Sequence, residues 1–316
     1  MPRPSPGPGE VLLKVTAAGI CGTDVHLYSG LFGEFPMVPG HDLSGVIEAI
    51  GEGVVPHRQG TRATVDPAAC CARAAVAGSL CPACQKGATN LCEQATYMGI
   101  SAPGGMTEYI AVPDARAVEL PDKVGDEAAT VLEPVAVALH MMDKLKDRPG
   151  DVLVIGGGPV GIAAALLLQL SGRRVMISEP LENRRKLIRQ MGIDQAVAPG
   201  QIPVERPAPI IVETSGHPSA VESIIGHTAA GATIFLVGGD TTIPGIVILT
   251  LELEIRAVKG GCGLYPEAVR MAAEGQIDMT PLISHRFDAR DAARAFRQAT
   301  DRPHQVTRAC LDMNVW

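Results

Sequence analysis

The pattern of apolar and polar residues changes character near residue 121. Between residues 10 and 120, short apolar stretches alternate with Gly and Pro, which is typical of strands joined by turns. The strands predicted here are Glu10–Val15, Leu43–Ile50, Thr61–Val65, Met106–Val112 and Ala117–Glu119. We therefore expect the first part of the chain to be a small β-barrel-like domain.

Beyond Pro121, helical and strand patterns alternate. A long helix is predicted over Asp126–Leu145, and an amphipathic helix over Ala289–Ala299 within a tail, Leu282–Trp316, that starts like a strand. Between them, the predicted elements are strands Asp151–Ile155, Arg174–Ser178, Ile210–Glu213, Ala232–Val237 and Glu254–Val258 and helices Val160–Leu170, Glu182–Met191, Ser219–Thr228 and Pro266–Glu274. Alternating βα units predict an α/β fold with a doubly wound parallel sheet.

Length and charge narrow the class of protein. A chain of 316 residues with 46% apolar residues is expected to form about two domains. The net charge of −7 argues against a nucleic-acid partner. The longest apolar run, Gly161–Leu168, is far shorter than the ~18 residues of a membrane helix. The Pro-rich start lacks the apolar stretch of a secretory signal, so we expect a cytoplasmic protein without a membrane partner.

A glycine-rich segment follows the first strand of the α/β part. Gly156-Gly-Gly158-Pro159-Val160-Gly161 fits the G-x-G-x-x-G pattern, in which backbone approaches a pyrophosphate at a helix N-terminus. Glu179 ends the next strand, where a carboxylate accepts hydrogen bonds from ribose hydroxyls and repels a 2′-phosphate. This favours NAD over NADP, with Arg184 stacking on adenine or bonding the ribose although an Arg can also hold a 2′-phosphate. The alternative is an ordinary turn followed by a solvated acid.

Three dispersed residues could hold a catalytic metal. Cys21, His41 and Glu133 offer a thiolate, an imidazole and a carboxylate, and three protein ligands with an open position suit a catalytic zinc. Taken singly, each has an ordinary structural interpretation as a buried Cys, a capping His or a helix-start Glu. Five of the eight cysteines lie between Cys70 and Cys92, which in a reducing compartment indicates metal binding before disulfides.

Taken together and in order, these motifs resemble a family. They resemble the zinc-containing medium-chain dehydrogenase/reductases over nearly the whole chain, and most closely the polyol (sorbitol) and threonine dehydrogenase branch, where Glu is the third zinc ligand. The segments that carry the resemblance are Cys21-Gly-Thr23-Asp24-Val-His26, Gly40-His41-Asp42, the cysteine cluster, Glu133-Pro134 and Gly156–Gly161. The resemblance implies a GroES-like β-barrel catalytic domain at 1–125, a Rossmann NAD-binding domain at 126–262 and a C-terminal segment, 263–316, that returns to the catalytic domain.

The resemblance also implies residue roles. Zinc on Cys21, His41 and Glu133 would lower the pKa of an alcohol that then gives its hydride to NAD⁺. Thr23 would hydrogen-bond the alcohol and start a proton relay through the nicotinamide ribose, and His26 would pass the proton to solvent, unless it is only a surface histidine. Asp42 stands where the branch usually has Glu. It is expected beside the metal or as an alternate ligand, or else as an ordinary strand-start acid.

The cysteine cluster matches the family's structural zinc lobe in part. That lobe reads Cys-x2-Cys-x2-Cys-x7-Cys, and its last three positions correspond to Cys81, Cys84 and Cys92. The first falls on Gly78, so an insertion over residues 72–78 would make Cys71, or Cys70, the first ligand. The alternatives are an empty lobe or one that holds a disulfide.

Further expectations rest on the same resemblance. The family normally carries residues before the segment with which this chain starts, so the first strands of the barrel are expected to be missing. Pairing through the strand Glu254–Val258, with the apolar run Ile243–Leu253 beside it, implies a homodimer or homotetramer. The expected activity is NAD⁺-dependent oxidation of a secondary alcohol (a polyol, aminocyclitol or hydroxy amino acid) to a ketone. The alternative is a catalytically inactive NAD(H)-binding structural or regulatory relative.

Overall fold

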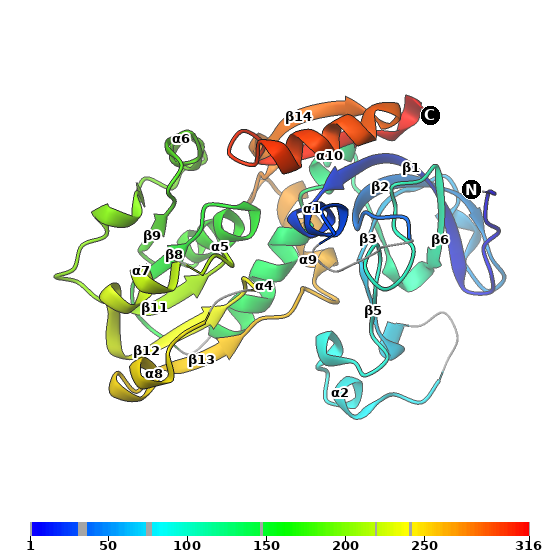
Figure 1. Ribbon diagram of the computed structural model, residues 1–316. Coiled ribbons are helices and arrows are strands. Elements are labelled where there is room, and N and C mark those ends of the chain that lie inside the picture. The colour runs from blue at the N-terminus through cyan, green and yellow to red at the C-terminus, as the bar shows by residue number, and fades with distance from the viewer. Residues whose placement is uncertain are drawn as a thin grey trace. The chain divides into compact units, whose positions relative to one another are not determined.

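The computed structural model describes residues 2–30, 37–73, 78–145, 148–218, 220–239 and 242–315. Contacts divide the chain into two compact units (Figure 1). Unit 1 comprises Met1–Ala136 and Gly260–Trp316, and unit 2 comprises Val137–Lys259. The chain therefore leaves unit 1 once, builds unit 2, and returns.

Unit 1 is built on a seven-stranded sheet, in the order β14-β15-β1-β2-β3-β7 with β6 also paired to β1. Most of its pairs are antiparallel, as expected for strands joined by short turns, whereas β14 and β15 run parallel. The strands are β1 (Glu10–Ile20), β2 (Asp42–Ile50), β3 (Arg62–Val65), β6 (Tyr109–Pro113), β7 (Ala117–Glu119), β14 (Ile283–Asp288) and β15 (Arg308–Asp312).

Strand β1 is the centre of that sheet because it pairs with three others. One edge pairs with β2 from Val11 to Gly19, with two register shifts. The other edge is shared, with β6 along Glu10–Lys14 and β15 along Ala17–Ile20. The last strand of the chain therefore lies directly beside the first.

Helices complete unit 1 around the sheet. They are α1 (Gly22–Tyr28), α2 (Pro82–Gln85), α3 (Asp126–Ala129), α9 (Tyr265–Ala273) and α10 (Ala292–Asp301), and β4 (Ala68–Ala69) pairs with β5 (Thr96–Tyr97) in a separate two-stranded ladder. The apolar face of α10 joins the core of the sheet through Phe296. The ring of Phe296 lies 5.0 Å from that of Tyr28, which connects α10 to α1.

Unit 2 contains the predicted parallel sheet. Its six strands have the order β10-β9-β8-β11-β12-β13, and every pair is parallel. This is the order of the doubly wound nucleotide-binding fold, so the predicted α/β class is confirmed. The strands are β8 (Val152–Ile155), β9 (Val175–Ser178), β10 (Ala196–Val197), β11 (Ala208–Glu213), β12 (Thr228–Leu236) and β13 (Glu254–Ala257).

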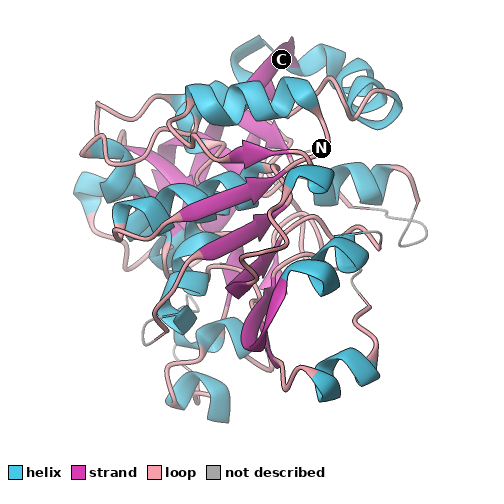
Figure 2. Ribbon diagram, turned by 90° about the vertical axis from the view of Figure 1, so that its left-hand side faces the viewer, coloured by secondary structure: helices cyan, strands magenta, loops and turns pink. Residues whose placement is uncertain are grey.

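Helices lie on both faces of this sheet (Figure 2). They are α4 (Glu133–Leu145), α5 (Pro159–Leu170), α6 (Glu182–Gln190), α7 (Ala220–His227) and α8 (Gly245–Thr250), of which α4 begins in unit 1. The central strands β8 and β11 are almost wholly buried, because a parallel sheet is covered on both sides. Among the described residues, none of the helices is both long and apolar enough to cross a bilayer.

The helix predicted over Asp126–Leu145 is interrupted, which corrects that expectation. α3 ends at Ala129 and α4 starts at Glu133. Pro134 has no N–H and cannot bond back to the carbonyl of Thr130, four residues earlier. That carbonyl instead accepts a hydrogen bond of 2.8 Å from Nη2 of Arg308. The interruption thus leaves one carbonyl free to bind a distant arginine.

Candidate functional site

The first cluster of chemistry-bearing residues is held together by Asp24. Cys21 precedes α1, and the Asp24 carboxylate reaches back to accept the Cys21 N–H at 2.8 Å. The other oxygen of Asp24 accepts the N–H of Gly40 at 3.0 Å and lies 3.8 Å from Nδ1 of His41. Asp24 is completely buried, and this burial raises its pKa. One carboxylate thus fixes the loops that carry Cys21 and His41.

A glycine is required at the turn before His41. Gly40 has φ +95°, and a Cβ there would lie 2.6 Å from Cγ of Met106. The turn delivers His41 and Asp42 to the start of β2, both buried. The motif Gly40-His41-Asp42 therefore has a geometric cause that is independent of any metal.

The structure brings three of the predicted residues together. The ligand atoms of Cys21, His41 and Asp42 all lie within 4.8 Å of one another. Nδ1 of His41 and Oδ1 of Asp42 are buried with no hydrogen-bond partner in the described part of the chain. Buried polar atoms rarely lack a partner, and these donors suit a zinc ion. The site therefore fits the metal that the sequence implies.

Glu133, the third expected ligand, is not among these three mutually close residues. It is the first residue of α4 and is partly buried. Its pKa is raised to about 7, mainly by burial and next by the charge of Asp42. The charge of His41 acts in the opposite direction. Glu133 thus belongs to the same electrostatic neighbourhood.

Arg308 is a member of the site that sequence reasoning missed. Its side chain is buried on β15 and donates to Oδ2 of Asp42 and to the carbonyl of Thr130. Burial alone would lower the pKa of Arg308, but the charges of Asp42 and Cys21 outweigh it and raise the pKa, so the guanidinium stays charged. Asp42 therefore already has a cationic partner on one oxygen. A lone Arg immediately before the apolar run Ala309–Leu311 was the available sequence signal.

Thr23 and His26, the residues expected to handle protons, both lie on α1 immediately after Cys21. Thr23 is partly buried and His26 is exposed. One side chain is thus shielded and the other is open to solvent.

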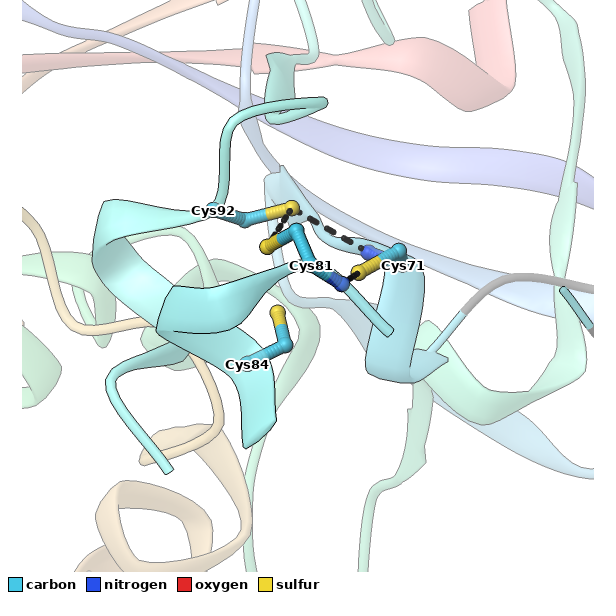
Figure 3. A group of neighbouring side chains, drawn as sticks. All are labelled: Cys71, Cys81, Cys84 and Cys92. Atoms are coloured by element: carbon cyan, nitrogen blue, oxygen red, sulfur yellow. Dashed lines mark hydrogen bonds between the residues drawn. The ribbon is translucent and has the colours of Figure 1, made fainter. Parts of the chain in front are cut away.

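Four cysteines form a second cluster (Figure 3). Cys71 lies in a short 3₁₀ turn, Cys81 and Cys84 lie at the start of α2, and Cys92 follows another 3₁₀ turn. Their sulfur atoms all lie within 4.8 Å of one another, and those of Cys81 and Cys92 are 3.8 Å apart. Four thiolates at about 2.3 Å from a central zinc would have sulfurs at nearly this separation.

Backbone N–H groups point at these sulfurs. Cys71 N lies 3.4 Å from Sγ of Cys92, and Cys81 N lies 3.3 Å from Sγ of Cys71. The backbone N–H of Cys84 lowers the pKa of Cys81 to about 6, which favours the thiolate that zinc needs. The structure thus places Cys71 in the cluster, whereas Cys70 interacts with Cys262. Residues 74–77 of the expected insertion lie outside the described residues.

The predicted dinucleotide turn is present between β8 and α5. Gly156 has φ +103°, and a Cβ on Gly161 would lie 1.9 Å from the Gly156 carbonyl oxygen, so neither position accepts another residue without rearrangement. A Cβ on Gly158 would meet nothing within 4 Å, and Gly158, Pro159 and Val160 are partly exposed. Open space over a helix N-terminus is what a pyrophosphate requires.

Glu179 supports this turn directly. It follows β9, is 3% exposed, and accepts hydrogen bonds from the N–H groups of Gly157 at 2.8 Å and Leu181 at 2.9 Å. The interpretation of Glu179 as a solvated acid is therefore wrong. Arg184 lies partly buried on α6, the next helix. Thr214, which sequence reasoning missed, also holds the turn by donating to the Ile155 carbonyl at 2.9 Å.

Comparison with known families gives two successive matches. Residues 7–122 match the alcohol dehydrogenase GroES-like domain, and residues 159–274 match the zinc-binding dehydrogenase domain. Among individual proteins, the starvation-sensing protein RspB of Escherichia coli is 31% identical over 92% of this chain and 88% of its own. L-Threonine 3-dehydrogenase of Serratia proteamaculans is 30% identical over 91% of this chain and 88% of its own.

Solved structures show the same architecture. An Escherichia coli RspB structure complexed with NADH matches with a TM-score of 0.87 and 29% identity, over 98% of this chain and 93% of that one. A putative zinc-binding dehydrogenase from Sinorhizobium meliloti bound to NADP matches with a TM-score of 0.85 and 29% identity, over the same shares of the two chains. Zinc and a nicotinamide dinucleotide, both expected from the sequence, are thus the cofactors of the matched family and of related structures.

Proposed function

Because the chain belongs to the zinc-containing medium-chain dehydrogenase/reductase family, in the polyol and threonine dehydrogenase-like branch, we propose that it oxidises a secondary alcohol to a ketone with zinc and NAD⁺. The observation that carries the proposal is the convergence of Cys21, His41 and Asp42, with unpartnered buried atoms on His41 and Asp42. When bound, zinc lowers the pKa of an alcohol and NAD⁺ accepts hydride.

The metal is held by this chain's own donors. Cys21 and His41 supply two ligands, and Glu133 supplies the third. Arg308 binds one oxygen of Asp42, and the other, Oδ1, has no partner in the described part of the chain. Asp42 is therefore a charged neighbour that orients the site or an alternate ligand. Asp24 holds the loops that carry Cys21 and His41 through its hydrogen bonds to the N–H groups of Cys21 and Gly40.

Proton transfer is assigned to α1. Thr23 would accept a hydrogen bond from the substrate hydroxyl while its own hydroxyl proton passes on through the nicotinamide ribose, and His26, exposed on the same helix, would release a proton to solvent. A histidine suits this step because its ordinary pKa lies close to neutral pH.

The dinucleotide is held by unit 2. The N–H groups at the start of α5 bind the pyrophosphate, and Glu179 binds the adenosine ribose hydroxyls, with Arg184 beside it. A carboxylate at this position repels a 2′-phosphate, so NAD⁺ is preferred over NADP⁺.

The substrate is a polyol, an aminocyclitol or a β-hydroxy amino acid. Relatives in this branch include L-threonine 3-dehydrogenase, named for a β-hydroxy amino acid, and a 2-dehydro-3-deoxy-L-galactonate 5-dehydrogenase, named for a hydroxylated sugar acid. The test is an absorbance screen for NADH formation by zinc-loaded protein over sugar alcohols, inositols, aminocyclitols and L-threonine. Turnover of one class with a ketone product supports the proposal.

A second outcome would contradict the proposed activity. Protein that binds NADH but contains no zinc and turns over no alcohol is a catalytically inactive relative. Zinc content is therefore measured on the same sample as the screen.

Assembly is proposed to use the free edge of the unit 2 sheet. β13 is the last strand in the sheet order, and α8, just before it, exposes Ile246 and Leu249 by 69% and 73%. Large exposed apolar side chains beside an open strand edge suit pairing with a second copy, giving a homodimer or homotetramer.

A further inference from the structure

Unit 2 contains a cavity whose lining does not include the glycine-rich turn. It has a volume of about 870 Å³ and is lined by residues at the amino ends of β8, β9 and β11. The glycine-rich turn follows the carboxyl end of β8. The cavity therefore lies at the opposite end of the strands from that turn. Its size is that of a small-molecule site.

Much of the cavity wall is apolar. Leu153, Met176, Ile202 and Pro209 line it, and Leu153 and Ile202 are also buried residues of the unit 2 core. Covering such a wall with an apolar group removes apolar surface from water, which favours binding.

The charged residues of the wall leave a positive excess. Asp151 is neutralised by Arg174 through two hydrogen bonds of 3.0 and 2.7 Å. Arg173, Arg206 and Asp194 remain, which is a net charge of +1. Arg206 is exposed and makes no ion pair or hydrogen bond with the described residues. Arg173 donates only a long bond of 3.3 Å to the carbonyl of Gly150.

A buried polar atom at the same wall also lacks a partner. Nδ1 of His227, the last residue of α7, is buried and has no hydrogen-bond partner in the described part of the chain. Such atoms are usually satisfied by a ligand or a water molecule. This observation is independent of the charge count and concerns the same cavity.

We propose that this cavity binds an organic anion with an apolar body. The anionic group, a carboxylate, sulfonate or phosphate, pairs with Arg206 and Arg173. The apolar body covers Leu153 and Ile202. A polar atom of the ligand, or a bound water molecule, forms the missing hydrogen bond to Nδ1 of His227. The site is separate from the dinucleotide site and does not depend on the proposed activity.

The probe is 8-anilinonaphthalene-1-sulfonate, an aromatic sulfonate that fluoresces when its rings leave water. The full-length, zinc-loaded protein is titrated in saturating NAD⁺, which keeps the dye out of the dinucleotide site. We expect one dye per chain, bound more weakly as salt concentration rises. Arg206→Gln and Arg173→Gln should each weaken binding by about tenfold, the effect of one charge-assisted hydrogen bond. Arg297→Gln, an exposed arginine of unit 1, is the matched control and should bind as the parent protein does.

Three results overturn the proposal. If NAD⁺ abolishes dye binding, the dye occupies the dinucleotide site. If Arg206→Gln and Arg173→Gln bind the dye as well as Arg297→Gln does, the two arginines do not bind the anion. Their charges then only stabilise the C-terminal ends of α5 and α7. If sulfate displaces the dye at equal concentration, no apolar body is recognised. Unfolding temperatures of all variants confirm that a loss of binding is not a loss of fold.

Discussion

Arg308 on β15 and Asp42 on β2 form an ion pair in which both side chains are almost completely buried, at 2% and 0% exposure. The same guanidinium donates to the carbonyl of Thr130, which Pro134 leaves without a helical partner. An arginine from the end of the chain thus joins β2 to the break between α3 and α4.

The first prediction concerns the stability that this pair provides. Arg308→Met leaves Asp42 buried without its cation, so urea denaturation should show a loss of about 3–5 kcal/mol in the free energy of unfolding. The double variant with Asp42→Asn should lose less than the sum of the single losses, because the two residues interact. Arg286→Met is the control, since its pair with Glu127 is exposed and should contribute about 1 kcal/mol or less. Equal losses in Arg308→Met and Arg286→Met would contradict the assignment.

The second prediction concerns the third zinc ligand. Glu133→Ala should reduce zinc affinity and turnover by well over ~10-fold, since even partners beside a ligand are worth ~10–100-fold. Asp42→Asn should lose less zinc than Glu133→Ala, because one oxygen of Asp42 is bound by Arg308. Zinc content and turnover are measured on both. Retention of zinc and activity in Glu133→Ala, with zinc lost from Asp42→Asn, would identify Asp42 as the ligand.

The third prediction separates the two adjacent cysteines. Cys71→Ser should remove one zinc per chain and expose the lobe around α2 to protease, because the sulfur cluster loses a ligand. Cys70→Ser is the matched control and should keep the full zinc content, since Cys70 interacts with Cys262. Atomic emission on both variants decides between them, and the reverse pattern would place Cys70 at the metal.

The fourth prediction concerns cofactor choice. The ratio of kcat/KM for NAD⁺ to that for NADP⁺ should favour NAD⁺, and Glu179→Gln should lower this ratio by about tenfold or more because a negative charge no longer repels the 2′-phosphate. Glu182→Gln changes an exposed carboxylate three residues further on and should leave the ratio nearly unchanged. Equal efficiency with both cofactors in the parent protein would show that Arg184 dominates the ribose pocket.

The fifth prediction concerns assembly. Replacing both Ile246 and Leu249 with Asp should convert a dimer or tetramer to monomers in sedimentation at micromolar concentration, because charges would be buried at the interface. Val204→Asp alters another apolar residue of unit 2 that is 63% exposed and should not change the assembly. A parent protein that already sediments as a monomer would contradict the proposed interface.

The sequence predicts the α/β unit better than it predicts unit 1. Strands β8, β9 and β11 are continuous apolar runs between turn signals, so their pattern alone identifies them. β15 was not predicted because Arg308 interrupts a short apolar run, and only a tertiary partner makes a buried arginine tolerable. The short helix α1 was not predicted either, because seven residues give too little periodicity.

For the candidate sites too, some features were predicted from the sequence and others depend on tertiary contacts. Five ordered motifs, with Cys21, His41 and Glu133 among them, predicted a metal site through their resemblance to a family. The parts of Asp24 and Arg308 depend on contacts between distant loops. Spacing could not distinguish Cys70 from Cys71, because adjacent residues project in different directions and only the backbone path decides.

The pairing of β1 with β15 has a consequence for biosynthesis. A ribosome releases β1 early, but its neighbour emerges only after all of unit 2 has been made. Until then the Ala17–Ile20 edge of β1 is unpaired, and an open strand edge can pair with another nascent chain. Unit 2 is continuous in sequence and can fold first. Unit 1 cannot be completed until β1 pairs with β15, which lies almost 300 residues further along the chain. Because that contact also brings Arg308 to Asp42, the surroundings of Cys21, His41 and Asp42 are complete only after the end of the chain has been made.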